Sequence, residues 1–387
     1  MRVAIIVLNL DIGGTQRVGV DLANAFYASK NDVHLITFGK KEIKLLPHKN
    51  ILIHRFNMQE SLKKTLMAIP FLIIAKIINM FLRKSFFIFN GLMMSLLFKY
   101  KFKKLEKKYG RFDLIIFRGN SVYELVWPLK DKRILQAIDN MDVKESTSLY
   151  EKVHAKLTLS DKNIVPISKE IEERVKDLIE NESIKLHSLH TIYGPLNEEN
   201  ILKLSLKYKP DIDSKYIVSI GRLAKVKNFE LLIETYKFAY ENLALRHKLV
   251  IVGGGDREDA LKELVSSYNL NEVILFTGSL NNPYPWLKGA ELFVTTSLSE
   301  GLGMTVLEAL ACRVKVVSTQ SKGGVKEIMH SELREYMIEF SAQKLAQKIV
   351  ETINETKEWD YEKFTHNFSP EVIVGEYQKL YYDKINS

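Results

Sequence analysis

Two glutamates, Glu300 and Glu308, stand eight residues apart in the second half of this 387-residue sequence. They follow AELFVTTS, an apolar run typical of a buried strand, and they flank the start of an expected helix. Carboxylates at such a place can accept hydrogen bonds from paired hydroxyl groups. The spacing therefore favours recognition of a polyol at the end of a strand.

Small residues lie between the two glutamates. Gly301 and Gly303 let the backbone come close to a ligand. The amides around Met304 and Thr305 then belong to the first turn of the helix, where they lack partners within the helix and attract phosphate. A phosphate flanked by two polyols is a nucleotide sugar.

Two cations follow another expected strand of the same half. Arg222 and Lys227 lie five residues apart in GRLAKVKN, directly after YIVSI. There they could converge on a diphosphate, and each charge-assisted hydrogen bond would contribute about 1.5 to 3 kcal/mol. The alternatives are helix capping for the glutamates and a solvated surface for the cations. The occurrence of both pairs after two strands of one domain favours binding.

A glycine pair in the first half could also meet an anion. Gly13 and Gly14 follow the run RVAIIVL, so their backbone amides would be exposed at a turn between a strand and a helix. A plain tight turn is the alternative explanation. The spacing is not G-x-G-x-x-G, so nothing here indicates a nicotinamide cofactor.

The elements that must position these residues alternate between short β-branched runs and longer amphipathic stretches, the rhythm of βαβ units. The rhythm stops in the connection of residues 189–216, which contains Gly194, Pro195 and Pro210, and then resumes. We predict an α/β protein with two Rossmann-like, doubly wound domains, residues 1–198 and 199–366, that face each other across a cleft. Residues 367–387 are expected to form a C-terminal helix.

Positive charge is concentrated in residues 61–108. The whole chain carries a net charge of +9, and this segment alone holds eleven Lys and Arg residues against one acid, Glu106. Its two apolar runs are too short or too interrupted to span a bilayer comfortably. Basic residues beside apolar runs favour helices that lie in the headgroup region of an anionic membrane.

Three other uses of this segment are weighed against membrane contact. Core helices with outward-reaching lysines are one alternative, and a hairpin that enters the bilayer is another. Nucleic-acid binding is disfavoured, because long aliphatic stretches separate the cation clusters.

Cys312 is the single cysteine, which excludes an intrachain disulfide, and the N-terminus reads as a strand rather than a signal peptide. We therefore expect a cytoplasmic protein attached peripherally to the inner face of the membrane.

These motifs resemble those of the retaining GT-B glycosyltransferases of group 1, also called family 4. SEGLGMTVLEALAC matches the family's E-x7-E element, and GRLAKVKN matches its GRL-x3-KN element. VIVGGGDRE and STQSKGGVKEI resemble its glycine-rich turn and its closing GG-x2-E segment, and NNPYPWL resembles bacterial surface-polysaccharide members. The resemblance covers nearly the whole second half and is weaker in the first. It also implies that the C-terminal helix of residues 367–387 crosses back to the first domain.

The resemblance implies a role for each matched residue. Glu300 would contact the transferred sugar and Glu308 the ribose hydroxyls, while Arg222 and Lys227 would neutralise the diphosphate. The residues that would line the sugar-phosphate site lie at the helix start, and they are Gly301, Gly303, Met304 and Thr305. No metal and no cofactor is implied.

In the first half, the loop GGTQR matches the family's glycine-rich loop, where the nucleotide sugar meets the acceptor. Gly13 and Gly14 would then contact the donor, and Gln16 and Arg17 the acceptor. Many relatives have a histidine after a middle strand, and this sequence has Ile138 or Asp139 at the corresponding place. Asp139 could orient or deprotonate the acceptor hydroxyl, or cap a helix.

The implied activity is metal-independent transfer of a hexose or N-acetylhexosamine, with retention, from a nucleotide diphosphate sugar, UDP being the first choice. The implied acceptor is a membrane-anchored glycan in the synthesis of surface polysaccharide, lipopolysaccharide or lipid-linked oligosaccharide. One alternative is a nucleotide-sugar epimerase or hydrolase, which would not explain residues 61–108. The other is a non-catalytic membrane-associated scaffold, against which the presence of both glutamates and both cations argues.

Overall fold

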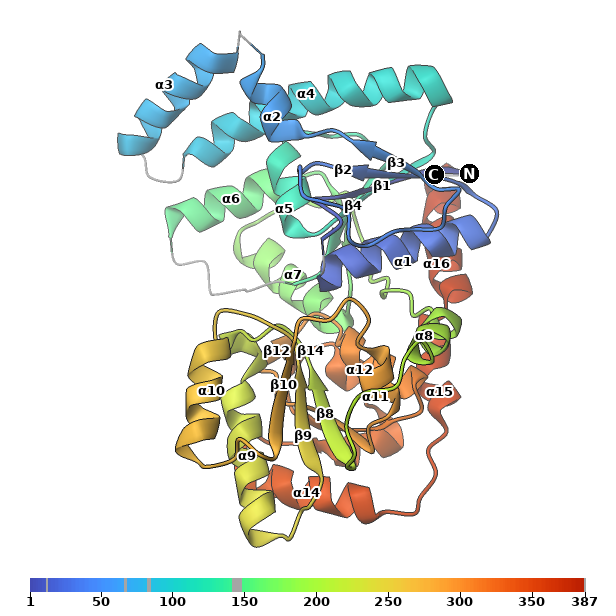
Figure 1. Cartoon of the computed structure of the whole chain (residues 1–387). Coiled ribbons are helices and arrows are strands. Elements are labelled where there is room, and N and C mark those ends of the chain that lie inside the picture. The colour runs from blue at the N-terminus through green and yellow to red at the C-terminus, as the bar shows by residue number, and fades with distance from the viewer. Residues whose placement is uncertain (12, 66–67, 82–84, 141–147, 386–387) are drawn as a thin grey trace. The chain divides into compact units, whose positions relative to one another are not determined.

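The computed structural model of the chain describes residues 1–11, 13–65, 68–81, 85–140 and 148–385. The chain divides into two compact units (Figure 1). Unit 1 comprises Met1–Pro195 and Pro370–Ser387, and unit 2 comprises Leu196–Ser369. The boundaries expected from the sequence, after residues 198 and 366, each lie three residues from these divisions.

A parallel sheet of seven strands forms the centre of unit 1, in the order β3-β2-β1-β4-β5-β6-β7. Its strands are mostly apolar, as expected where helices cover both faces of a parallel sheet. They are β1 (Arg2–Val7), β2 (Asp32–Thr37), β3 (Leu52–Arg55), β4 (Leu114–Arg118), β5 (Ile134–Ile138), β6 (Asn163–Pro166) and β7 (Ser188–Leu189).

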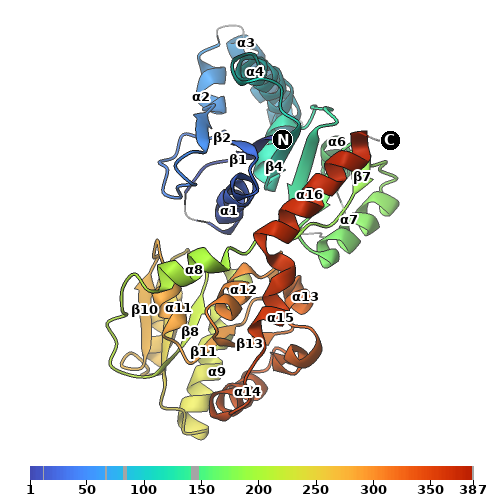
Figure 2. The same ribbon diagram turned by 90° about the vertical axis from the view of Figure 1, so that its right-hand side faces the viewer.

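Different helices cover the two faces of this sheet. Helices α1 (Gly14–Ala28) and α16 (Pro370–Ile385), both labelled in Figure 2, pack against each other. Phe26 of α1 meets Tyr377 of α16 with ring centroids 5.8 Å apart, and both belong to the core that includes Ile116. Phe98 of α4 (Phe86–Tyr109) meets Phe117 at 5.7 Å. Neighbouring residues of a strand point to opposite faces, so α4 covers the face opposite α1 and α16. The helix expected in residues 367–387 thus packs within unit 1.

Shorter helices complete unit 1. They are α2 (Met58–Lys63), α3 (Ala68–Phe81), α5 (Asn120–Tyr123), α6 (Leu149–Leu159), α7 (Lys169–Asn181) and a single 3-10 turn, Glu124–Val126.

The described residues of the basic, apolar segment 61–108 are mostly helical, as predicted, and the two long helices, α3 and α4, differ in burial. Phe98 and Phe102 of α4 are buried, so this helix is partly the core element that the sequence left as an alternative. In α3, Ile77, Met80 and Phe81 are 51%, 78% and 82% exposed. Within the described ranges, no helix is long and apolar enough to cross a bilayer. Membrane contact stays a prediction, and α3 offers the surface for it.

Unit 2 contains a six-stranded parallel sheet in the order β10-β9-β8-β11-β13-β15, and a separate two-stranded parallel pair, β12-β14. The six strands are β8 (Tyr216–Ile220), β9 (Lys248–Val252), β10 (Ile274–Gly278), β11 (Leu292–Thr295), β13 (Lys315–Thr319) and β15 (Met337–Ile338). The pair consists of β12 (Ser299–Glu300) and β14 (Lys322–Gly323).

The helices of unit 2 follow its strands along the chain. They are α8 (Glu198–Ser205), α9 (Phe229–Asn242), α10 (Glu258–Ser267), α11 (Tyr284–Lys288), α12 (Met304–Ala311), α13 (Val325–Ile328), α14 (Ala342–Asn354) and α15 (Tyr361–Thr365), with 3-10 turns at Lys225–Lys227, Ser331–Tyr336 and His366–Phe368.

Numbered along the chain within each main sheet, the six strands of the unit 2 sheet and the first six strands of the unit 1 sheet have the same order, 3-2-1-4-5-6. This is the arrangement of a doubly wound Rossmann sheet, and it confirms the predicted fold class. In such a sheet the order reverses between strands 1 and 4, and ligands bind beyond the carboxyl ends of the strands at that point. The reversal lies between β1 and β4 in unit 1 and between β8 and β11 in unit 2.

Candidate functional site

The loops that follow β8 and β11 meet at the carboxyl edge of the sheet of unit 2. Lys227 comes from the first loop and Glu300 from the second, and Lys227 Nζ donates a hydrogen bond to Glu300 Oε1. Ser297 Oγ donates to the same oxygen at 2.7 Å. The side chains of Lys227 and Glu300 are only 21% and 14% exposed, so this ion pair is partly shielded from water.

Two hydrogen bonds to backbone carbonyls hold the same two loops together. Leu298 N donates to the carbonyl of Val226 at 2.8 Å, and Thr296 Oγ1 donates to the carbonyl of Asn228 at 2.9 Å. Asn228 adopts the left-handed conformation with φ of 51°, a shape that asparagine tolerates better than most residues. The position of Lys227 relative to Glu300 is therefore fixed by the fold itself.

The backbone of Glu300 is fixed from a second side by Gly323. The two residues are partners in the β12-β14 pair, and Gly323 has a φ of +104°. A Cβ atom at position 323 would overlap the carbonyl group of Glu300. The glycine of the GG-x2-E segment thus permits a close approach of two backbones, and that approach sets where Glu300 lies.

Helix α12 begins beside this glutamate. Gly303 precedes it with a φ of +97°, and a Cβ atom there would lie 2.8 Å from Val325 Cγ2. The amides of Met304 and Thr305 are in the first turn, where a helix supplies no acceptor, and both residues are partly exposed. The start of α12 therefore presents amide donors next to the Lys227–Glu300 pair.

Arg222 contrasts with Lys227 in having no local partner. Its side chain is exposed and makes no hydrogen bond or ion pair within the described part of the chain. Its loop is nevertheless anchored, since Leu223 N donates to the carbonyl of Gly254 at 3.0 Å. Side chains at Gly253 and Gly255 would collide with the carbonyls of Gly221 and Leu223. Arg222 is thus an unneutralised cation on a rigid loop.

Glu308 is more buried than the sequence suggested, at 7% exposure. Its Oε1 accepts a hydrogen bond of 3.0 Å from the hydroxyl of Tyr284, which belongs to the NNPYPWL segment. Burial beside Glu308 raises the pKa of the Cys312 thiol to about 12, so this cysteine is protonated at neutral pH. A role of Glu308 toward ribose hydroxyls stays a prediction.

The candidate residues of unit 1 lie at its own strand ends. Gly13 caps the start of α1, where Arg17 N donates to the carbonyl of Gly13 at 2.9 Å. A Cβ atom at Gly13 would collide with the Gln16 side chain, whereas one at Gly14 would meet no atom within 4 Å. The loop is close-packed at the first glycine and open at the second. The assignment of these residues to donor and acceptor stays a prediction.

Asp139, at the end of β5, forms a buried ion pair. Arg118, at the end of β4, donates from Nη2 to Asp139 Oδ1 at 2.5 Å, and both side chains are less than 10% exposed. Burial raises the pKa of Asp139, although Arg118 and a hydrogen bond from Thr15 oppose this shift. The carboxylate is thus bound to Arg118 rather than presented at the surface, and its catalytic role stays a prediction.

Sequence reasoning missed three partners of the residues it selected. Ser297 and Tyr284 hold Glu300 and Glu308, and Arg118 holds Asp139. Only Arg118 gave a signal, a charged residue at the end of the apolar strand LIIF. Over the described ranges, no three or more His, Cys, Asp or Glu side chains are grouped to hold a metal ion.

Comparison with a protein family finds a match within unit 2. Residues 200–368 match the family model of glycosyl transferases group 1. The N-acetylgalactosamine-N,N'-diacetylbacillosaminyl-diphospho-undecaprenol 4-alpha-N-acetylgalactosaminyltransferase of Campylobacter jejuni is 38% identical over 165 residues, 43% of this chain and 43% of that protein. The lipopolysaccharide core biosynthesis glycosyltransferase LpsE of Rhizobium meliloti is 31% identical over 153 residues, 40% and 42% of the two chains. The matched segments span less than half the length of these relatives.

Solved structures match the whole chain. Sucrose-phosphate synthase from Thermosynechococcus elongatus aligns with a TM-score of 0.70 at 18% identity, over 100% of this chain and 99% of that one. HepE from Anabaena, solved in complex with UDP-glucose, aligns with a TM-score of 0.64 at 15% identity, over 100% and 99%. At these identities the likeness shows the fold, which is the GT-B fold.

The Gly323–Glu300 contact predicts a stability effect. Gly323→Ala should lower the free energy of unfolding by about 2 kcal/mol or more, because the methyl group meets backbone and the φ is unfavourable for alanine. Gly375→Ala is the matched control, since Gly375 is exposed inside α16 with no atom near its Cβ position, and it should raise stability by about 0.5 to 1 kcal/mol. Urea unfolding measures both, and wild-type stability of Gly323→Ala would contradict the proposed contact.

Proposed function

We propose that this protein, which carries a group 1 glycosyltransferase domain in residues 200–368 on a GT-B fold, transfers a hexose or N-acetylhexosamine from a nucleotide diphosphate sugar to a membrane-anchored glycan. The observation that carries the proposal is the Lys227–Glu300 pair, with the exposed Arg222 on the same loop as Lys227 and the start of α12 shortly after Glu300 in the chain. Cations, amide donors and a carboxylate together match the diphosphate and sugar parts of such a donor.

The diphosphate is proposed to bind Arg222 and Lys227. Negative charge builds on it as the bond to the sugar breaks, so fixed positive groups lower the barrier. An ammonium group has three donors, and Glu300 accepts from Lys227 through one of them. Lys227 can therefore stay aligned by Glu300 and still donate to the donor's phosphates. Arg222 makes no ion pair within the described residues, so it would break none when it binds the diphosphate.

Glu300 is proposed to contact the transferred sugar. Its carboxylate is already oriented by Ser297 and Lys227, and its backbone is fixed by Gly323. A carboxylate held in this way can accept hydrogen bonds from sugar hydroxyls without first becoming ordered. Glu308, oriented by Tyr284, is proposed to receive the ribose hydroxyls.

The reaction is proposed to retain the anomeric configuration and to need no metal. In such a reaction the leaving phosphate receives the acceptor proton on the same face of the sugar, so no strong protein base is required. Two cations and the start of α12 provide the positive field. Asp139 then serves through its ion pair with Arg118, which holds the ends of β4 and β5 beside the Gly13–Gly14 loop.

The donor and acceptor classes are supported by relatives. A structure of the same fold, HepE, was solved with UDP-glucose, which supports UDP as the nucleotide. The Campylobacter relative is named for a diphospho-undecaprenol substrate and LpsE for lipopolysaccharide core synthesis, which supports an acceptor anchored in a membrane. We therefore propose a lipid-linked or lipopolysaccharide glycan as acceptor.

Helix α3 is proposed to bring the protein to the cytoplasmic face of the membrane. Its exposed Ile77, Met80 and Phe81 can enter the interface between headgroups and acyl chains. Exposed lysines of α4, Lys103 and Lys107 among them, add electrostatic attraction to anionic lipids.

Removing the unpaired cation tests the donor site. Arg222→Ala should slow sugar transfer about a hundredfold, equivalent to about 2 to 3 kcal/mol of lost charge stabilisation. Lys225→Ala, in the same loop and also exposed, should stay within about twofold of wild type. The assay follows nucleoside diphosphate release from a panel of nucleotide sugars with membrane-extracted glycan acceptors. Unchanged turnover of Arg222→Ala would refute the diphosphate clamp, and donor cleavage without transfer would favour the hydrolase alternative.

Vesicle flotation tests the membrane surface. The wild-type protein should float with anionic vesicles, less so as salt is raised, because screening weakens the lysine contribution. Met80→Ser/Phe81→Ser should reduce flotation at least fivefold, whereas Leu206→Ser, at 79% exposure in unit 2, should not change it. Equal flotation on neutral vesicles would contradict the electrostatic part, and unchanged flotation of the double variant would contradict docking through α3.

A further inference from the structure

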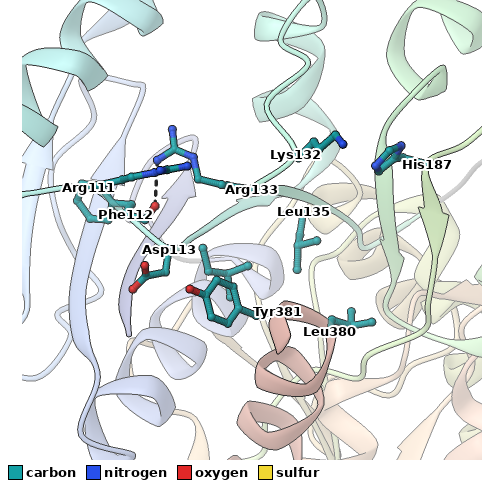
Figure 3. Close-up of a pocket in the computed structure, with 10 residues that line it drawn as sticks. Arg111, Phe112, Asp113, Lys132, Arg133, Leu135, His187, Leu380 and Tyr381 are labelled. Carbon is teal, nitrogen blue, oxygen red and sulfur yellow. Dashed lines mark hydrogen bonds between the residues drawn. The ribbon is translucent and has the colours of Figure 1, made fainter. Parts of the chain in front are cut away.

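A pocket in unit 1 lies at the amino-terminal edge of its sheet, away from the strand ends just described (Figure 3). It opens between the starts of β4 and β5, the segment before β7, and the last turns of α16, and its volume is about 600 Å³. Leu114 begins β4 and Arg118 ends it, so at about 3.3 Å per residue the two edges are about 13 Å apart. The pocket is therefore separate from Asp139 and from the Gly13–Gly14 loop.

Basic side chains line one side of the pocket. Figure 3 places Arg111 and Arg133 at one end of this side and Lys132 and His187 at the other. Arg133 is neutralised, because it forms ion pairs with Glu106 at 2.5 Å and Asp131 at 2.7 Å. Arg111 and Lys132 are exposed and make no ion pair or side-chain hydrogen bond with any residue in the described ranges. Two cations whose side-chain donors are not used within the described ranges thus line the same pocket.

One acid, Asp113, also lines the pocket, and its Oδ2 accepts the backbone N–H of Arg2 at 2.7 Å. Burial and the neighbouring Asp113 raise the pKa of Tyr381. With Glu106 and Asp131 beside Arg133, three acids balance the three cations Arg111, Lys132 and Arg133. The pocket is therefore not cationic overall, but the side-chain donors of Arg111 and Lys132 are available to an anion.

The floor of the pocket is apolar. Phe112 is buried just before β4, Leu114 and Leu135 are buried in β4 and β5, and Leu380 and the ring of Tyr381 close the side formed by α16. Figure 3 shows the Leu135, Leu380 and Tyr381 side chains together, across from the basic side. A volume of this size with an apolar floor and a few convergent polar groups is typical of small-molecule sites.

We propose that this pocket binds an organic phosphate whose ester group is apolar or aromatic. Arginine presents planar pairs of donors that match phosphate oxygens, and Lys132 adds a second charge. The ester group would lie on Leu135, Leu380 and the ring of Tyr381. The site is independent of the proposed sugar transfer, since none of its residues belongs to unit 2 or to the carboxyl edge of the sheet in unit 1.

Such a ligand would link α16 to the sheet. Tyr377, one turn before Leu380 and Tyr381, packs on Phe26 of α1, the helix that begins at the Gly13–Gly14 loop. A phosphate ester that contacts both Arg111 and the end of α16 would restrain that helix. Ligand binding to the folded state alone also stabilises it.

Calorimetric titration of the full-length protein tests the site with phenyl phosphate, octyl phosphate and inorganic phosphate. At least one ester should bind wild type ten times more tightly than inorganic phosphate. Tighter binding of octyl phosphate would indicate a lipid source, and tighter binding of phenyl phosphate a soluble aromatic one. Equal binding of all three probes, or binding of none, would overturn the proposal.

Variants test whether the phosphate esters bind in this pocket. Arg111→Ala/Lys132→Ala should weaken ester binding at least tenfold, while Lys49→Ala/Lys209→Ala, which removes two exposed lysines elsewhere, should not. Arg222→Ala should bind the esters like wild type, which separates this pocket from the proposed donor site. Unchanged affinity in Arg111→Ala/Lys132→Ala, or loss in Arg222→Ala, would refute the assignment.

Discussion

The Lys227–Glu300 ion pair is the interaction on which the candidate site depends. Strands β8 and β11 are neighbours in the sheet although their sequences are some 75 residues apart, and each delivers one member of the pair. The pair lies where the strand order reverses, the place at which doubly wound sheets bind ligands. Because both side chains are mostly shielded, loss of either would leave the other without compensation in a partly dry environment. Contacts of Ser297, Asn228 and Gly323 hold the pair and its two loops in place.

In unit 1 an ion pair also joins the ends of two neighbouring strands, with different residues. Arg118 and Asp139 join the ends of the neighbouring strands β4 and β5, and a Cβ atom at Gly119 would lie 2.9 Å from Thr15 in the first turn of α1. The loops that follow β1, β4 and β5 are therefore fixed to one another by one ion pair and one close contact. Each unit thus has a rigid carboxyl edge, built before any ligand arrives.

Local patterns in the sequence predicted much of this arrangement. Apolar runs located the main strands, and parallel topology then brings residues that follow strands to one edge, so Lys227 and Glu300 could be grouped in advance. The same topology brings Arg118 and Asp139 together at the ends of β4 and β5, although the sequence analysis selected only Asp139. The partner of Glu308 could not be foreseen in this way, because Tyr284 and Glu308 lie on two helices, and only the packed fold brings them close. The two-residue strands β12 and β14 are too short for a periodic signal. Composition identified the helices of residues 61–108, but it could not show that α4 buries Phe98 while α3 leaves Phe81 exposed.

The central claim, that Lys227 binds phosphate while Glu300 binds sugar, is tested most directly by calorimetric titration of UDP and of UDP-sugars into two variants. Lys227→Met should bind both ligands at least ten times more weakly than wild type. Glu300→Gln should bind UDP within about twofold of wild type but lose affinity for the UDP-sugar that wild type prefers. Wild-type affinity of Lys227→Met for UDP would contradict the account.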